Sequence, residues 1–115
     1  MSTSLSHEEI KTLLVDDEEV AIHRLKKLLG AYPYVNIIGE SKDGRSAVDL
    51  INSQRPDLVF LDIQMPGSNG FEVLDQLLYT PLVVFTTAYE EYAVKAFEKN
   101  SLDYLLKPVR MKGWL

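Results

Sequence analysis

The chain has 115 residues, of which 46% are hydrophobic and 25% charged, a composition typical of one folded domain. It contains no cysteine, which excludes disulfides, thiolate metal sites and a cysteine nucleophile. A formal net charge of −5 disfavours direct contact with nucleic acid, because such binding depends on Lys and Arg neutralising phosphates. No signal peptide and no run of roughly 20 apolar residues is present, so we expect a cytoplasmic protein without membrane contact.

The first elements in chain order are a leader, a strand and a helix. Residues 1–9 are polar and are expected to form a flexible leader. The apolar run within 10–15 predicts a strand, and it ends at a cluster of acids over 16–19. From residue 20 the apolar residues recur at helical spacing, which predicts a helix over 20–29 with Gly30 at its end.

Strands and helices continue to alternate along the rest of the chain. Short apolar runs predict four further strands, over 35–39, 58–61, 82–85 and 102–106. Apolar stripes predict helices around 47–51, 71–78 and 92–97, and an incomplete last helix over 109–115. This alternation predicts an α/β fold: a doubly wound, five-stranded parallel sheet with right-handed crossovers.

Four of the five predicted strands are followed by polar side chains, namely Asp16 and Asp17, Asp62, Thr87 and Lys107. Each of these residues alone has an ordinary structural explanation, such as a turn aspartate or a solvated lysine. However, the carboxyl ends of parallel strands meet at one edge of a sheet, which is where open α/β sheets bind ligands. The joint occurrence therefore predicts a functional site at this edge.

The acids of this edge predict a metal site. Two carboxylates about 4 Å apart repel by about 4 kcal/mol at an effective dielectric near 20, so Asp16, Asp17 and Asp62 need a divalent cation. Oxygen ligands without His or Cys favour Mg²⁺. Glu18 and Glu19 are assigned to the first turn of the following helix, where acids interact favourably with the helix dipole.

The chemistry that fits this set of groups is phosphoryl transfer to an aspartate. Asp62 is the candidate acceptor, which would form an acyl phosphate. The metal and Lys107 would neutralise charge on the phosphoryl oxygens, and Thr87 would donate a hydrogen bond to one of them.

These residues resemble the receiver domain of bacterial two-component response regulators. The matching motifs are LVDDE at 14–18, FLDIQMP at 60–66, FTTA at 85–88 and DYLLKP at 103–108. The resemblance implies a flavodoxin-like strand order of 2-1-3-4-5 and a receiver domain over 10–115. It also implies a signalling module rather than an enzyme, one that catalyses only its own phosphorylation and dephosphorylation.

The same resemblance implies roles for individual residues. Asp62 would take a phosphoryl group from the phosphohistidine of a sensor histidine kinase. Mg²⁺ would be bound by Asp17, Asp62 and the backbone carbonyl of Gln64, with Asp16 acting through water. Thr87, which precedes a small residue, and Lys107 would contact the phosphoryl group.

Switching would involve Thr87 and Tyr104, since the aromatic ring turns inward in the family when the threonine moves. A finer resemblance, over 87–93, 96–97 and 103–108, is to receivers joined to LytTR-type DNA-binding domains. It implies a transcription regulator whose output domain lies outside this chain, and phosphorylation-dependent homodimerisation is a further expectation.

Three alternatives are open at this point. A haloacid-dehalogenase-like phosphatase also uses a strand-end aspartate, but it needs a second acid where this chain has Gln64. A flavodoxin-like FMN carrier shares the fold, but the acids over 16–19 would repel its phosphate. A pseudo-receiver would only bind partners, and it would need neither the acidic pocket nor Lys107.

Overall fold

The computed structural model describes residues 9–89 and 103–107. The strands of this part are β1 (Ile10–Val15), β2 (Val35–Ser41), β3 (Leu58–Asp62), β4 (Leu82–Thr87) and β5 (Asp103–Leu106), and its helices are α1 (Glu19–Leu29), α2 (Gly44–Gln54) and α3 (Gly70–Asp75). All neighbouring strands run parallel, in the order β2-β1-β3-β4-β5. The predicted fold class and strand order are therefore confirmed. The helices predicted around 92–97 and 109–115, and the leader up to residue 8, lie outside the described residues.

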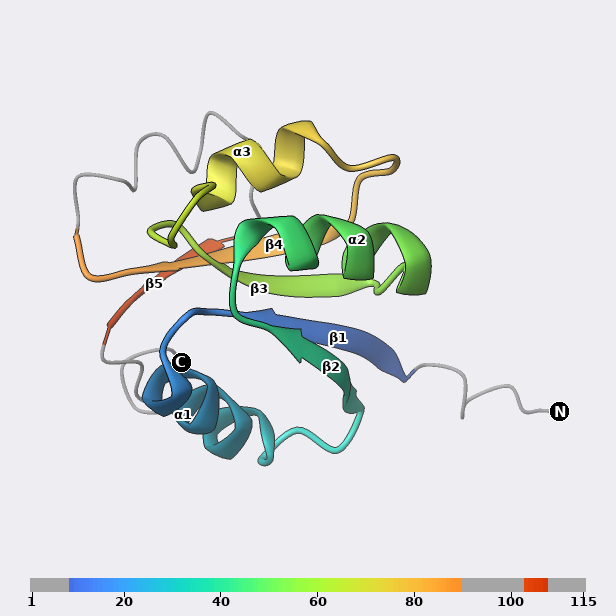
Figure 1. Cartoon of the computed structure of the whole chain (residues 1–115). Helices are drawn as coiled ribbons and strands as arrows, with labels where there is room; N and C mark the ends of the chain where they lie inside the picture. Colours follow the sequence, from blue (N-terminus) through green and yellow to red (C-terminus); the bar gives the residue numbers. More distant parts are fainter. Residues whose placement is uncertain (1–8, 90–102, 108–115) are drawn as a thin grey trace, which may run out of the picture.

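Apolar side chains from the two faces of the sheet form two separate cores. In Figure 1, α1 lies on one face of the sheet, while α2 and α3 lie together on the other. The core beneath α2 and α3 includes Leu13, Val15, Ala47, Ile51, Val59, Leu61, Phe71 and Phe85. The core beneath α1 includes Leu14, Ile22, Leu25, Leu29, Phe60, Val84 and Leu105. Successive residues of β1, β3 and β4 therefore alternate between the two faces, as the pleat of a strand requires.

The third helix is shorter than its apolar pattern predicts. It begins at a capping box in which Asn69 and Glu72 exchange side-chain and backbone hydrogen bonds, and it ends at Asp75 rather than at residue 78. The backbone N–H of Leu78 donates to the Asn52 side chain on α2 (2.8 Å) instead of continuing the helix. A contact between α2 and the segment after α3 thus takes the place of a further helical turn.

The connection from β3 to α3 returns closely to the end of β3. The Gly70 N–H donates to the Ile63 carbonyl (2.8 Å), and a Cβ added at Gly70 would lie 2.7 Å from the Asp62 carbonyl oxygen. Glycine is therefore required where α3 begins. This contact packs the start of α3 directly against the backbone that carries Asp62.

None of the helices in the described part of the chain combines the length and apolar character that crossing a membrane requires.

Candidate functional site

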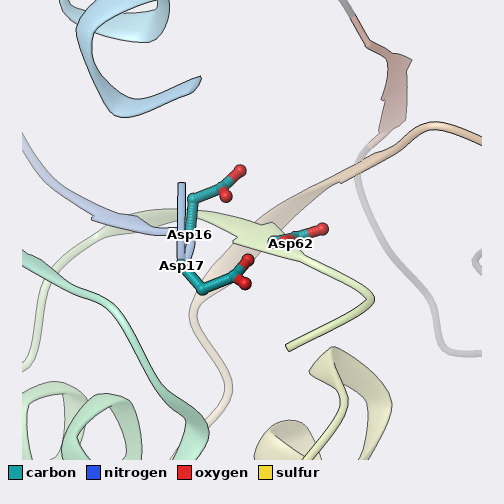
Figure 2. Close-up of side chains that lie close together, drawn as sticks. All are labelled: Asp16, Asp17 and Asp62. Carbon is teal, nitrogen blue, oxygen red and sulfur yellow. The ribbon is translucent and has the colours of Figure 1, made fainter. Parts of the chain in front are cut away.

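Three aspartates meet beyond the ends of β1 and β3. Asp16, Asp17 and Asp62 each place a carboxylate oxygen within 4.8 Å of those of the other two. Figure 2 shows their side chains extending to the same side of the two strand ends. Asp16 and Asp62 are buried, whereas Asp17 is exposed. The sequence-predicted acidic cluster is therefore present, with two buried carboxylates and one on the open side.

The register of the sheet accounts for this convergence. Val15 on β1 pairs with Leu61 on β3, so that Asp16 and Asp62, one residue further on, become neighbours. Leu14 and Phe60 face α1, and two residues on, the pleat places Asp16 and Asp62 on that same face. The apolar core beneath α1 therefore ends at these two carboxylates.

Lys107 reaches the cluster from the end of β5. Its backbone N–H donates to the Thr87 carbonyl (2.8 Å), which fixes the end of β5 beside that of β4. Its Nζ lies 2.9 Å from Asp16 Oδ2, 2.9 Å from Glu18 Oε1 and 3.5 Å from Asp62 Oδ2. The predicted meeting of Lys107 with the aspartates is thus seen directly, and one carboxylate of the group, Glu18, was not expected there.

Burial raises the pKa of both buried aspartates. The pKa of Asp62 is raised to about 7, first by burial and then by the negative charge of Asp16, against the opposing effect of Lys107. Burial likewise raises the pKa of Asp16, although the Glu18 backbone N–H and Lys107 partly offset it. The pKa of Lys107 is raised as well: burial lowers it, but the surrounding carboxylates outweigh that effect. Without a bound cation, Asp62 therefore keeps its proton to a higher pH than an ordinary aspartate does.

The two threonines at the end of β4 lie in different environments. Thr86 pairs with Asp62 across the sheet, and its hydroxyl is buried and has no hydrogen-bond partner. It lines a cavity of about 330 Å³ together with Asp16, Lys107 and residues of α1. The Thr87 hydroxyl, also buried, accepts a hydrogen bond from the Tyr89 N–H (3.0 Å). Thr87, the predicted contact for the phosphoryl group, is therefore bound to the following loop in this state.

Two further predicted site residues are placed only in part. The Gln64 N–H donates to Asp62 Oδ1 (3.2 Å), and Gln64 and Asp17 line the same open hollow. Tyr104 pairs with Phe85 through the backbone of β5, and its side chain lies outside the description. The structure thus brings Gln64 to the site and assigns Tyr104 to β5, the strand that precedes Lys107.

Glu18 is the site residue that sequence reasoning missed, since it was assigned to the first turn of a helix. It is the N-cap residue of α1, but its side chain makes no capping hydrogen bond. Its carboxylate binds Lys107, which is 89 residues away in sequence. The available signal was weak: Glu is an uncommon residue at an N-cap, where Ser, Thr, Asp or Asn is preferred.

The donor set fits a hard divalent cation. Asp16, Asp17 and Asp62 offer carboxylate oxygens only, and such ligands are preferred by Mg²⁺, Ca²⁺ and Mn²⁺ over softer metals. The exposed position of Asp17 leaves room for the waters that Mg²⁺ retains. The cluster is thus able to hold such an ion.

Comparison with known families identifies the chain. Residues 12–113 match the family described as the response regulator receiver domain. This chain belongs to that family. The receiver is a module of two-component signalling rather than a classical enzyme, as its sequence motifs predicted.

Named relatives and a solved structure agree with this assignment. The receiver is 45% identical over 105 residues to the transcriptional regulatory protein BtsR of Salmonella typhi, covering 90% of this chain and 44% of that protein. It is 47% identical over 102 residues to the sensory transduction protein LytT of Bacillus cereus, covering 86% of this chain and 42% of LytT. The response regulatory domain of mrkE from Klebsiella pneumoniae superposes with a TM-score of 0.81 at 33% identity, covering 90% of this chain and 88% of that one.

These matches are consistent with the predicted likeness to LytTR-type regulators. The receiver spans less than half the length of BtsR and LytT.

Proposed function

We propose that Asp62 accepts a phosphoryl group from the phosphohistidine of a sensor histidine kinase, in a Mg²⁺-dependent reaction. The observation that carries this proposal is the position of Asp62. Its side chain is 4% exposed, belongs to a cluster of three acids and lies 3.5 Å from the Lys107 ammonium. A buried nucleophile between a cation site and an ammonium is the arrangement that phosphoryl transfer requires.

In the proposed reaction, a carboxylate oxygen of Asp62 attacks phosphorus as the bond from phosphorus to the kinase histidine breaks. The histidine nitrogen keeps the bonding electron pair, and an acyl phosphate forms on Asp62. Lys107 stabilises the charge on a phosphoryl oxygen from the β5 side, and the Thr87 hydroxyl donates a hydrogen bond to another. A bound Mg²⁺ supplies positive charge to the phosphoryl oxygens.

Four residues are the proposed holders of Mg²⁺. Asp17 and Asp62 would bind it through carboxylate oxygens, Gln64 through its backbone carbonyl and Asp16 through water. The mutual proximity of the three carboxylates supports this set, as does the hydrogen bond from the Gln64 N–H to Asp62, which holds Gln64 against the acceptor.

The proposed switch is a population shift that begins at Thr87. In the described state its hydroxyl accepts the Tyr89 N–H and donates to the Tyr89 carbonyl oxygen at 3.5 Å, so its O–H must turn away from that oxygen to donate to the phosphoryl group. Tyr104, on the neighbouring strand, would respond by turning inward. The added charge on Asp62 would favour the second arrangement through its differential contacts with Thr87 and Lys107.

The partners of this receiver follow from the same proposal. A cytoplasmic sensor histidine kinase would donate the phosphoryl group. An output domain of the LytTR DNA-binding type would receive the signal, because the matched relatives BtsR and LytT are named as regulatory and sensory transduction proteins. We further propose that residues 10–115 form the receiver unit, that it does not itself contact DNA or a membrane, and that it forms a homodimer when phosphorylated.

The test is intact-mass measurement after incubation with Mg²⁺ and the small phosphodonor acetyl phosphate. The expected result is a mass increase of one phosphoryl group that a chelator prevents. A folded, Mg²⁺-binding protein that gains no mass, and that also fails to bind beryllofluoride, would contradict phosphoryl acceptance and favour a module that only binds partners.

A further inference from the structure

Glu18 occupies the N-cap position of α1 without capping the helix. An N-cap side chain normally accepts a hydrogen bond from an N–H of the first turn. The backbone of Glu18 has the required extended conformation (φ −101°, ψ 120°), but its side chain makes no such bond. Its Oε1 instead accepts a hydrogen bond from Lys107 Nζ at 2.9 Å. The side chain therefore binds the lysine that follows β5 and does not cap its own helix.

Glu18 is also held to Asp16, so three residues form a closed ring. The Glu18 N–H donates to Asp16 Oδ1 (2.9 Å), while Asp16 Oδ2 lies 2.9 Å from Lys107 Nζ. Within this ring the Asp16 side chain is 1% exposed and that of Glu18 is 62% exposed. The lysine ammonium is thus bound by a buried carboxylate and by one at the surface.

The geometry leaves donors of Lys107 for the reaction. A lysine ammonium carries three N–H groups, and Glu18 accepts one of them, while Asp16 Oδ2 lies at ion-pair distance without a hydrogen bond. Asp62 Oδ2 is the third neighbouring oxygen, at 3.5 Å, which is longer than an ordinary hydrogen bond. The N–H groups that Glu18 does not accept are therefore available to an oxygen that arrives beside Asp62.

We propose that Glu18 is a positioning residue: it anchors the Lys107 ammonium so that one of the other N–H groups faces a phosphoryl oxygen on Asp62. Lysine is a compact charge on a flexible stem, and ordering it before the reaction removes an entropic cost from the transition state. This inference rests on the proposed phosphoryl transfer to Asp62. It assigns to Glu18 a contribution to rate rather than to stability, since exposed ion pairs contribute little to stability.

Glu19 provides a matched control on the next residue. It lies in the first turn of α1, it is exposed, and it pairs with Lys42 at the start of the β2–α2 connection. Changing either glutamate to glutamine removes one negative charge from the same end of the same helix. Only the change at Glu18 removes an anchor of Lys107.

The experiment compares the wild-type chain with Glu18→Gln and Glu19→Gln by two measurements. The first is the NMR signal of the Lys107 ammonium in metal-free protein labelled with ¹⁵N-lysine, assigned by its loss in Lys107→Arg. The second is the rate of phosphorylation by acetyl phosphate with Mg²⁺, analysed as a maximal rate and a half-saturating donor concentration.

Glu18→Gln is expected to shift or broaden the Lys107 signal and to lower the maximal rate roughly fivefold, the upper limit for one exposed ion pair. The half-saturating concentration should not rise, because losing a negative charge does not weaken the binding of an anionic donor. Glu19→Gln should leave the Lys107 signal and the maximal rate at wild-type values.

Two results would overturn the inference. One is a Lys107 signal in Glu18→Gln identical to that of the wild type, and the other is an equal maximal rate in the two variants. If the wild type accepts no phosphoryl group while its Lys107 signal still depends on Glu18, the proposed function fails and the anchoring of Lys107 stands.

Discussion

Asp16 and Asp62 are buried carboxylates at the ends of the adjacent strands β1 and β3, and the Lys107 ammonium is closer to the first than to the second. It lies 2.9 Å from Asp16 Oδ2 and 3.5 Å from Asp62 Oδ2. The Lys107 ammonium therefore offsets the negative charge of Asp62 less than that of Asp16. The pKa of Asp62 is raised to about 7 by burial and by the charge of Asp16. The fold therefore disfavours the charged form of Asp62, the proposed acceptor, when no cation is bound.

This imbalance predicts that Asp62→Asn stabilises the metal-free protein, and that the gain depends on pH. Between the usual pKa of 3.8 and about 7, the folded state binds a proton at Asp62 that the unfolded state has lost. Wild-type stability therefore falls as pH rises through this window. The variant avoids that loss, so its free energy of unfolding should exceed that of the wild type by up to about 4 kcal/mol at about pH 8 and by little at about pH 4.

Urea denaturation at these two pH values measures the gain. Asp49→Asn, on the exposed face of α2, is the matched control and should change the unfolding free energy little at either pH. The raised pKa would be contradicted if Asp62→Asn increased the free energy of unfolding equally at both pH values, or decreased it at the higher pH.

Mg²⁺ binding should depend on pH for the same reason. Carboxylate ligands bind metal in their deprotonated form, so binding below about pH 7 must release the proton held at Asp62. The affinity is expected to fall by up to about tenfold per pH unit below that value and to level off above it. Calorimetric titration in buffers of different ionisation enthalpy measures both the affinity and the released proton. An affinity that is constant from about pH 5.5 to about pH 8 would argue against Asp62 as a metal ligand.

The two threonines of β4 predict opposite effects of the same substitution. Thr86→Val replaces a buried hydroxyl that has no partner with a methyl group of the same shape, and it should stabilise the protein by about 1 kcal/mol. Thr87→Val removes the acceptor of the Tyr89 N–H and should destabilise it by about 1 kcal/mol. Thermal unfolding of the pair tests this, and a loss of stability in Thr86→Val would mean that its hydroxyl has a partner in solution.

The close approach of Gly70 to the backbone of Asp62 predicts that a larger residue at position 70 destabilises the protein. In Gly70→Ala the new Cβ would meet the Asp62 carbonyl oxygen at 2.7 Å, so the start of α3 must move away from β3 at a cost of about 1–3 kcal/mol. Gly30→Ala is the control: Gly30 has φ −60°, and a Cβ there meets its nearest atoms at 3.4 Å. Denaturation midpoints should therefore fall for Gly70→Ala and stay within error for Gly30→Ala. Equal midpoints for the two variants would contradict the close contact.

The sequence was sufficient to predict the sheet and the meeting of Asp16, Asp62 and Lys107, because the carboxyl ends of parallel strands share one edge. It was not sufficient to predict which face each side chain occupies. β1, β3 and β4 are apolar on both faces, so the alternation that would separate Thr86 from Thr87 is hidden.

Two other features depended on contacts between distant residues. The bond from Glu18 to Lys107 joins positions 89 residues apart, and local pattern suggested only a helix start. The early end of α3 depends on Asn52 accepting the Leu78 N–H, a contact that the apolar spacing of α3 does not reveal. In both cases a tertiary contact decided the outcome against a reasonable local expectation.

The most direct test of the account is to locate the phosphoryl group after incubation with acetyl phosphate and Mg²⁺. Borohydride reduces an acyl phosphate to an alcohol, so the phosphorylated aspartate becomes homoserine, which peptide sequencing by mass spectrometry identifies. The account predicts homoserine at position 62, none in Asp62→Asn, and intact aspartate at positions 16 and 17. Homoserine at position 16 or 17 instead, in a folded wild-type protein, would contradict the assignment of Asp62 as the acceptor.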